Sequence, residues 1–447
     1  MTQLSAFAVC PSGLEAPLAE ELSRIEGVGE VQAGKAGCWF RADATAIARA
    51  NLWCRIPTRI LLMLDQLRLR SADDLYAAAK RLPWEKYLHP AQTIRIDVNQ
   101  GRPAPFELAL PFAGFKVKDG LCDRLRDLTG ERPSVDTRNP DIRIWVYIDG
   151  DKATLSIDTS GEPLFKRGWR LAKGEAPLRE NLAAALVQMT GVGRQGPGAW
   201  MPPVIVDPMA GSGTLLIEAA GLMAGLAPGF HPTNPRRFAC EDFNKASPFG
   251  RVDFLGLRAD CAAAWARATA LELPQMVGRD LDERLVRVAK DNAARALPPA
   301  ISQQLVFEQA DFFEVTAPTA CVSTATAEPK SPSPDPSGSE PAAQTSLLIT
   351  NLPYGKRVQM SEDEPRRLSE TLKRQYAGYQ AWLLTDNLKL DSAIRLKAGR
   401  RIPVFNGDIE CRWMRFDMVA GSARRERPAE ANQPSEPGLS AGAAKQP

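Results

Sequence analysis

The sequence predicts an α/β protein in which a mixed α+β front part precedes a domain built on a mostly parallel sheet. From about Ala176 onward, helical runs alternate with strand-like runs, a rhythm typical of parallel strands with helices on both faces of the sheet. Before residue 170, short strand-like runs mix with amphipathic helical runs. Near the end of the chain, Asn406-Gly407 between two strand-like runs predicts a β-hairpin.

The composition is that of an ordinary globular protein. The chain has 447 residues, of which 44% are hydrophobic and 24% charged, which suits two or three domains and excludes collagen-like and wholly disordered classes. The 56 Lys and Arg residues against 53 Asp and Glu permit an anionic partner without requiring one. The first residues carry no basic leader, and no run approaches the roughly 20 apolar residues of a membrane span. We therefore expect a cytoplasmic protein with no membrane partner.

No metal site is expected. The eight cysteines never fall as C-x-x-C, and with only two histidines the usual zinc spacings cannot be built. The cysteines are expected to be small core residues in a reducing compartment.

The front part is expected to form two small α+β units. Its predicted strands are residues 6–9, 38–41, 93–98, 142–148 and 152–158, and its predicted helices are residues 14–25, 44–50 and 112–128. Farther along, residues 317–345 and 421–447 are rich in Pro, Ser, Thr and Ala, so we predict a disordered insert and a disordered tail there. A strand is expected to resume at Ser346–Thr350.

A glycine turn follows the first apolar strand of the second part. Residues 204–214 read VIVDPMAGSGT and lead into the helical run LLIEAAGLMAG. Gly211 and Gly213 allow a sharp turn and a close backbone approach to a ligand, and the helix that follows offers free N–H groups. Taken alone, such a turn serves a dinucleotide, a phosphate or simple tight packing equally well.

Two acids at later strand ends extend the pattern. Asp280 ends the run VGRD, where a carboxylate can accept hydrogen bonds from both hydroxyls of a ribose. It lies 69 residues after Gly211, farther than in a dinucleotide fingerprint, so a hydride-transfer cofactor is disfavoured and an inserted segment near residues 227–275 is expected. Asp282 is better explained as the cap of the next helix. Asp311, beside Phe312 and Phe313, suits an adenine, whose amino group a carboxylate accepts and whose face an aromatic ring covers.

The run TNLPYG at residues 350–355 is the most informative motif. An exocyclic amine on a nucleobase is a poor nucleophile because its lone pair is delocalised into the ring. Hydrogen bonds from the amine to the side-chain oxygen of Asn351 and to a nearby backbone carbonyl can hold its nitrogen toward tetrahedral geometry, while Pro353 fixes the turn and Tyr354 stacks on the extruded base. No covalent enzyme intermediate is expected, because the sequence has no Pro-Cys nucleophile motif.

In this order, the glycine turn, the two acids and Asn-x-Pro-Tyr resemble the Rossmann-like amino-methyltransferases that use S-adenosylmethionine. The runs GLEAPLAEEL, NLWCRIPTRILL, PDIRIWVYI, DTSGEPLFKRGWR and APLRENLAAALV narrow the resemblance to bacterial THUMP-containing methyltransferases that act on guanine N2 of large-subunit ribosomal RNA. The resemblance covers roughly residues 4–420. It implies a ferredoxin-like unit at residues 1–60, a THUMP RNA-binding unit at 61–160, and a class I methyltransferase domain at 161–420 with a seven-stranded sheet that ends in the hairpin.

The resemblance also assigns roles to residues of this sequence. Asp280 would contact the ribose, Asp311 the adenine, and Asn351, Pro353 and Tyr354 the target base, with Asn351 also beside the cofactor. The turn that binds S-adenosylmethionine would comprise Asp207, Pro208, Ala210, Gly211, Ser212, Gly213 and Thr214.

Three departures from the family pattern stand out. Leu352 replaces the usual proline, which adds a backbone N–H and frees φ, so the site is expected to be looser or differently selective. Ala210 stands where cysteine is usual and should be tolerated. Some members are fused to a second methyltransferase, whereas a single reaction is expected here.

RNA binding has separate support in the sequence. The run FKRGWR at residues 165–170 interleaves cations with aromatics, a composition suited to phosphates and base stacking. Lys166, Arg167, Trp169 and Arg170 are therefore the predicted RNA contacts, with Lys116 and Lys118 as an extension of the patch.

These inferences predict an enzyme that methylates the exocyclic N2 of a guanine in large-subunit ribosomal RNA, free or in a precursor particle. One alternative is an adenine-N6 methyltransferase acting on RNA or DNA, because Asn-x-Pro-Tyr serves either amine. Another is a non-catalytic RNA-binding or ribosome-assembly factor that retains the fold, and the weakest is a hydride-transferring oxidoreductase.

Overall fold

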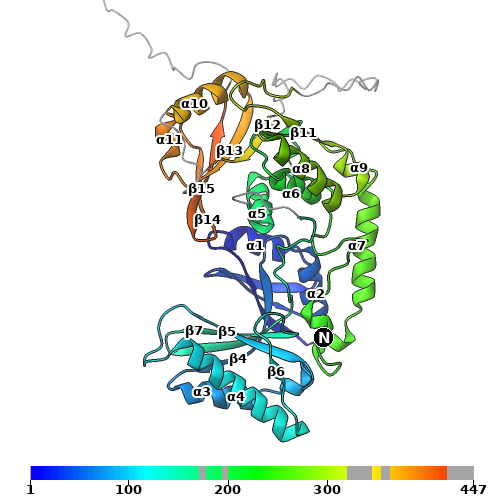
Figure 1. The fold of residues 1–447 in the computed structure, drawn as a ribbon, viewed down its shortest axis with the longest axis vertical. Helices are drawn as coiled ribbons and strands as arrows, with labels where there is room; N and C mark the ends of the chain where they lie inside the picture. Colours follow the sequence, from blue (N-terminus) through cyan, green and yellow to red (C-terminus); the bar gives the residue numbers. More distant parts are fainter. Residues whose placement is uncertain (1, 171–177, 194–199, 320–344, 354–362, 420–447) are drawn as a thin grey trace, which may run out of the picture.

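The α/β architecture is confirmed in a computed structural model (Figure 1), which describes residues 2–170, 178–193, 200–319, 345–353 and 363–419. The molecule is elongated, with the front part at one end, the second part at the other, and helix α7 along one side. The predicted insert and tail fall largely outside the described residues. No helix in the described ranges is long and apolar enough to cross a membrane.

The front part has one continuous sheet rather than two separate ones. Within the described residues it holds eight strands in the order β2-β3-β1-β4-β8-β7-β5-β6. The strands are β1 Leu4–Val9, β2 Val28–Gly34, β3 Gly37–Ala42, β4 Arg59–Arg68, β5 Thr93–Gln100, β6 Ser134–Val135, β7 Ile142–Asp149 and β8 Lys152–Asp158. The helices are α1 Glu15–Leu22, α2 Ala44–Trp53, α3 Ala72–Arg81 and α4 Leu110–Thr129, with a short 3-10 turn η1 at Trp84–Lys86.

Strand β4 joins the two halves of this sheet. Its first residues pair antiparallel with β1, in the register Ala6↔Leu62 to Val9↔Arg59. The same strand pairs antiparallel with β8 from Leu61 to Arg68. The predicted unit boundary after residue 60 therefore falls inside β4, and the sheet continues from one unit to the next, with a register shift between Met63 and Asp65.

The second part contains the predicted mostly parallel sheet. Its seven described strands lie in the order β11-β10-β9-β12-β13-β15-β14, and all neighbours are parallel except the pairs that involve β15. The strands are β9 Val204–Asp207, β10 Gln275–Asp280, β11 Leu305–Gln309, β12 Ser346–Asn351, β13 Tyr379–Thr385, β14 Arg400–Asn406 and β15 Ile409–Asp417. Both the hairpin at Asn406-Gly407 and the strand that resumes at Ser346 are confirmed.

Helices cover both faces of this sheet. They are α5 Glu180–Thr190, α6 Thr214–Met223, α7 Phe254–Ala268, α8 Glu283–Ala296, α9 Pro299–Ser302, α10 Glu364–Gln375 and α11 Leu390–Ala393, with 3-10 turns η2 Ala239–Glu241 and η3 Pro248–Arg251. Asp282 caps α8 as predicted, accepting a hydrogen bond from the Arg284 N–H at 2.8 Å. The helix buries one stripe, including Val286, Ala289 and Ala293, because apolar residues recur at helical spacing.

The expected insertion between Asp207 and Asp280 connects the second part to the front part. Backbone N–H groups in this segment donate to carbonyls of the front part, with Gly229 bonded to Leu52 at 2.8 Å and Asn244 bonded to Tyr87 at 3.1 Å. The insertion thus extends the junction beyond the covalent link near residue 160.

A buried ion cluster completes the junction. Arg55 of the front part lies 2.9 Å from Glu218 on α6, and Arg167 lies 3.2 Å from the other carboxylate oxygen of Glu218. All three side chains are less than 10% exposed. Burial lowers the pKa of the Arg55 guanidinium, and the carboxylate of Glu218 opposes that shift. One carboxylate therefore neutralises part of the charge of two buried arginines.

We predict that Glu218→Gln destabilises the protein by about 3 kcal/mol or more, because two buried guanidinium groups lose their counter-charge. Urea unfolding followed by circular dichroism measures the change. The matched control is Glu283→Gln, whose carboxylate faces Arg287 on the surface and whose loss should change stability by less than about 0.5 kcal/mol. Superimposable unfolding curves for Glu218→Gln and wild type would contradict the structural role of the cluster.

Candidate active site

Polar residues end three neighbouring parallel strands. Strand β9 pairs with β10 on one side and with β12 on the other. Strands β9 to β11 extend the sheet in one direction, and β12 and β13 extend it in the other. Asp207, Asp280 and Asn351 are the last residues of β9, β10 and β12. Open α/β sheets bind ligands beyond the carboxyl ends of their strands at such a switch point. The structure therefore brings these three predicted site residues to one edge.

The glycine turn after β9 has the geometry of a ligand-binding loop. Gly211 and Gly213 have φ values of +54° and +80°, which residues with side chains rarely adopt. A Cβ at Gly213 would lie 3.1 Å from atoms of Ala289 and Phe307, so the turn is also packed closely against α8 and β11. Helix α6 begins at Thr214, directly after the turn, and its first N–H groups face the edge where Asp207 ends.

Asp207 is buried at the centre of this edge. Its side chain accepts hydrogen bonds from the Thr350 hydroxyl at 2.8 Å and from the Met209 N–H at 3.2 Å. Burial raises the pKa of Asp207 to about 7, with the nearby Asp280 adding to the shift. Sequence reasoning missed the role of Thr350, although a hydroxyl directly before Asn351 in an otherwise apolar strand was the available signal.

Asp280 holds the glycine turn in place and can still accept further hydrogen bonds. Its two carboxylate oxygens accept from the Gly211 N–H and the Asp282 N–H, each at 2.9 Å, and the residue is half-buried. Each carboxylate oxygen can accept a second hydrogen bond, so a ribose remains compatible with this arrangement. Asp311 lies just beyond β11 and accepts from the Phe313 N–H at 2.8 Å. The neighbouring Phe312 is buried in the core, so its ring packs against protein.

Asn351 presents an unpaired acceptor. Its side-chain Oδ1 is buried and has no hydrogen-bond partner among the residues that the structure describes, although a buried polar atom normally has one. The next residue, Leu352, is almost fully buried and donates its N–H to the Leu384 carbonyl on β13 at 3.0 Å. The added N–H that was expected to loosen the site thus extends the ladder between β12 and β13. Pro353 is exposed, and Tyr354 lies outside the described residues.

Most of the predicted RNA contacts in residues 165–170 are buried, which corrects the sequence-based interpretation. Arg167 belongs to the Glu218 cluster, and Arg170 pairs with Glu180 at 3.0 Å and donates to the Thr214 hydroxyl at 2.7 Å. Trp169 is 8% exposed. Only Lys166 among these four is largely exposed, and it pairs with Glu162. Cations and aromatics in one short run were mistaken for a surface patch because composition does not show burial.

Lys116 and Lys118 lie on α4, where an unexpected aromatic pair accompanies them. Phe112 and Phe115 are 48% and 60% exposed, and each lies within 6.0 Å of one lysine amine, ring centroid to nitrogen. A hollow of about 430 Å³ between α4 and β5 is lined in part by Phe115, Lys118 and Val135. The exposure of this pair is not apparent from the sequence, because apolar residues of an amphipathic helix normally face the core.

The edge formed by β9, β10 and β12 fits a nucleoside cofactor with a charged tail. The glycine turn leaves backbone room, and Asp280 retains hydrogen-bond capacity. The described residues hold no cluster of three or more His, Cys, Asp or Glu side chains suited to a metal ion.

Strand β15 is the one described antiparallel strand of this sheet, and it lies between β13 and β14. This strand order and the glycine turn after the central strand β9 define a class I methyltransferase domain. The sequence profile of the RMKL-like methyltransferase domain matches residues 167–329 and 339–415, more than half of the chain. The chain belongs to this family. Profiles of the THUMP domain and of the RlmL ferredoxin-like domain match residues 70–158 and 5–61.

Known proteins resemble the chain over most of its length. It is 35% identical over 427 residues to the ribosomal RNA large subunit methyltransferase K/L of Syntrophotalea carbinolica, an alignment covering 92% of this chain and 53% of that protein. The chain thus spans about half the length of the curated relatives it matches. The structure of SMU.472 complexed with SAH has a TM-score of 0.72 at 24% identity, covering 93% of this chain and 98% of that one. A predicted N6-adenine-specific DNA methylase from Listeria monocytogenes also gives 0.72, at 25% identity and 93% and 97% coverage.

The raised pKa of Asp207 predicts a pH-dependent stability. Its folded pKa of about 7 lies above the ordinary value of about 3.8, so its contribution to the free energy of unfolding is complete below about pH 4 and is lost as the pH rises through 7. Asp207→Asn keeps an acceptor oxygen and does not titrate. Relative to this variant, the wild type without cofactor should lose on the order of 3 kcal/mol between about pH 5 and pH 8. Chemical unfolding at a series of pH values measures this difference, and parallel pH profiles would refute the assignment.

Proposed function

We propose that the protein transfers a methyl group from S-adenosylmethionine to the exocyclic N2 of a guanine in large-subunit ribosomal RNA. The observation that carries the proposal is the buried, unpaired Oδ1 of Asn351 at the carboxyl end of β12. An acceptor that is unpaired among the described residues carries a cost that a donor on a bound ligand can relieve. An exocyclic amine supplies such a donor.

Asn351 orients the amine and needs no charge to do so. When the amine donates a hydrogen bond to Oδ1, its nitrogen is held so that its one lone pair can face the cofactor. The cofactor supplies an electrophilic methyl carbon on a sulfonium. The nitrogen forms one bond to that carbon, sulfur keeps the electrons of the broken bond, and the methylated amine releases one proton to water.

Rigid support makes this orientation effective. Leu352 is held to β13 through its backbone N–H, and Thr350 is held to Asp207 through its hydroxyl. Both neighbours of Asn351 are thereby fixed to different strands of the sheet. A reacting group held close to its productive geometry avoids much of the entropic cost of alignment.

RNA as the substrate is supported by the THUMP profile at residues 70–158 and by the names of the relatives. The exposed ring pair Phe112 and Phe115 beside Lys116 and Lys118 adds a physical reason, because exposed aromatics stack on unpaired bases and lysines neutralise phosphates. Guanine N2 rather than adenine N6 rests on the motif resemblance. We therefore make the identity of the methylated nucleoside a direct readout of the test.

Asn351→Ala should reduce methyl transfer by at least about 100-fold while leaving cofactor binding within about twofold, because it removes the amine acceptor and no part of the glycine turn. The assay follows tritium from S-adenosylmethionine into RNA, or into precursor particles, from cells lacking this protein. Isothermal titration with S-adenosylhomocysteine reports cofactor binding.

Nucleoside analysis of the labelled RNA then separates the alternatives. N2-methylguanosine in large-subunit RNA supports the proposal, whereas N6-methyladenosine would show that the target base is adenine. Unchanged turnover in Asn351→Ala refutes the assigned role. Cofactor and RNA binding without transfer by the wild type would favour a non-catalytic assembly factor.

Phe115→Ala combined with Lys118→Ala should raise the KM for RNA about tenfold or more, because a stacking surface and a phosphate contact are lost together. The KM for S-adenosylmethionine should stay unchanged. Leu128→Ala is the matched control, since Leu128 is 53% exposed at the other end of the same helix. Equal KM values for RNA in all three proteins would exclude this face of α4 from RNA binding.

A further inference from the structure

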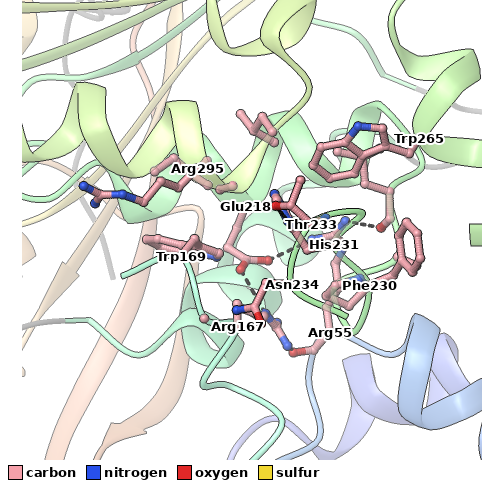
Figure 2. Close-up of a pocket in the computed structure, with 18 of the residues that line it drawn as sticks. Arg55, Arg167, Trp169, Glu218, Phe230, His231, Thr233, Asn234, Trp265 and Arg295 are labelled. Carbon is pink, nitrogen blue, oxygen red and sulfur yellow. Dashed lines mark hydrogen bonds and ion pairs between the residues drawn. The ribbon is translucent and has the colours of Figure 1, made fainter. Parts of the chain in front are cut away.

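A second cavity lies at the junction between the front part and the methyltransferase domain (Figure 2). Its volume is about 370 Å³, near the lower end of the roughly 300–1,000 Å³ that small-molecule pockets occupy. It is lined by the end of α8, the middle of α6, α7, the segment after the front sheet and the insertion that follows α6. All of its lining residues belong to the described ranges.

This cavity is separate from the methyl-transfer edge. Glu218 and Gly221 line it from α6, four and seven residues after Thr214, which places them about 6–10 Å farther along the helix axis from the glycine turn. Arg295 and Leu297 line it from the end of α8, a helix that starts just after the carboxyl end of β10 and runs back along the sheet. The cavity therefore lies toward the amino ends of the strands.

Aromatic side chains stand on opposite sides of the cavity. In Figure 2, Trp169 lies on one side of the group around Glu218, and Trp265 and Phe230 lie on the other. The ring of Trp265 is held edge-on by His231, with ring centroids 5.1 Å apart. Trp169 has Arg170 over its ring at 5.3 Å. Because Trp169 is nearly covered, the ring surface open to a planar heterocycle is that of Trp265 and Phe230.

Polar groups of the insertion add hydrogen-bonding capacity between the rings. Thr233 and Asn234 line the cavity, whereas its one lining carboxylate, Glu218, has both oxygens occupied by Arg55 and Arg167. A ligand there meets hydroxyl and amide groups that can serve as donors or acceptors, without an available anionic side chain to repel a phosphate.

Arg295 supplies a cation at the edge of the cavity. In the described ranges no carboxylate lies within ion-pair distance of it, whereas Arg287, two turns earlier on the same helix, pairs with Glu283 at 3.9 Å. Figure 2 shows the Arg295 side chain extending past Trp169 on the side away from Trp265. A guanidinium with no carboxylate partner in the described ranges is suited to a phosphate.

We propose that the junction cavity binds one nucleotide, with its base against Trp265 and its phosphate at Arg295. This assignment rests on the proposed RNA substrate. The occupant is a nucleotide of the RNA strand other than the methylated one. The cavity lies where the RNA-binding front part meets the methyltransferase domain, and its volume admits one nucleotide rather than a longer segment. A free mononucleotide has the same chemistry, and the test distinguishes the two sources.

The test titrates guanosine and adenosine 5′-monophosphates at millimolar concentrations into the full chain, with S-adenosylhomocysteine saturating the cofactor site. The wild type should bind one nucleotide per chain, and Arg295→Gln should weaken this binding about tenfold. Trp265→Ala should weaken it at least as much. Arg287→Gln on α8 and Leu255→Ala on α7, both at exposed positions, should leave it unchanged.

Adding substrate RNA distinguishes the sources. Release of the bound mononucleotide by RNA, with a tenfold higher KM for RNA in Arg295→Gln, assigns the cavity to the RNA strand. Retention of the nucleotide with an unchanged KM assigns it to a free nucleotide and overturns the RNA source. No nucleotide binding, together with an unchanged KM for RNA in Arg295→Gln, overturns the site itself. Because nucleotide binding is measured without methyl transfer, the cavity can be confirmed even where the proposed methylation fails.

Discussion

The parallel pairing of β9 with β10 on one side and β12 on the other is the constraint on which the active site depends. The register Gly278↔Asp207 and Leu348↔Val206 brings three polar strand ends to the same edge. Backbone hydrogen bonds set this register, so the site does not depend on flexible loops for its spacing. The Thr350 hydroxyl then ties the end of β12 to the carboxylate that ends β9. Buried polar groups tolerated at this edge are consistent with a site that a ligand completes.

The second constraint is the rigid connection between the two parts of the molecule. Strand β4 makes one sheet of the front part, and the insertion after α6 bonds back to that part through Gly229 and Asn244. The cluster of Arg55, Glu218 and Arg167 places charge in the same junction. Since a buried ion pair adds little net stability over an apolar contact, its value here lies in specifying one arrangement of the two parts. Removing one partner is then costly even though the pair itself is not a large source of stability.

The features that the sequence predicted are those set by hydrophobic periodicity and by the polar residues at strand ends. The alternation after Ala176 predicted the parallel sheet. Asp280 and Asn351 were predicted as site residues because a carboxylate suits a ribose and an amide oxygen suits an exocyclic amine, and Asp207 followed from the family resemblance. Strand β4 was missed because residues 60–64 form a continuous apolar run, which does not distinguish a fully buried strand from a helix segment. Helix α3 was also missed, although Ser71 and Asp74 form a capping box that the sequence displays. These elements carry the connection between units, which the family resemblance divides at residue 60, near the end of the ferredoxin-like match at residue 61.

The run FKRGWR shows why composition alone cannot locate an interface. Its cations and rings were interpreted as an RNA surface, yet Arg167 and Arg170 each face a buried carboxylate and Trp169 is nearly covered. A long amphipathic side chain can serve either role, and only the carboxylates supplied by distant segments decide between them. Glu218 lies 51 residues from Arg167, a separation that no local pattern conveys. The same run nevertheless borders the junction cavity through Trp169. Its basic and aromatic character is therefore divided between holding the two parts together and shaping a polar, ring-lined space between them.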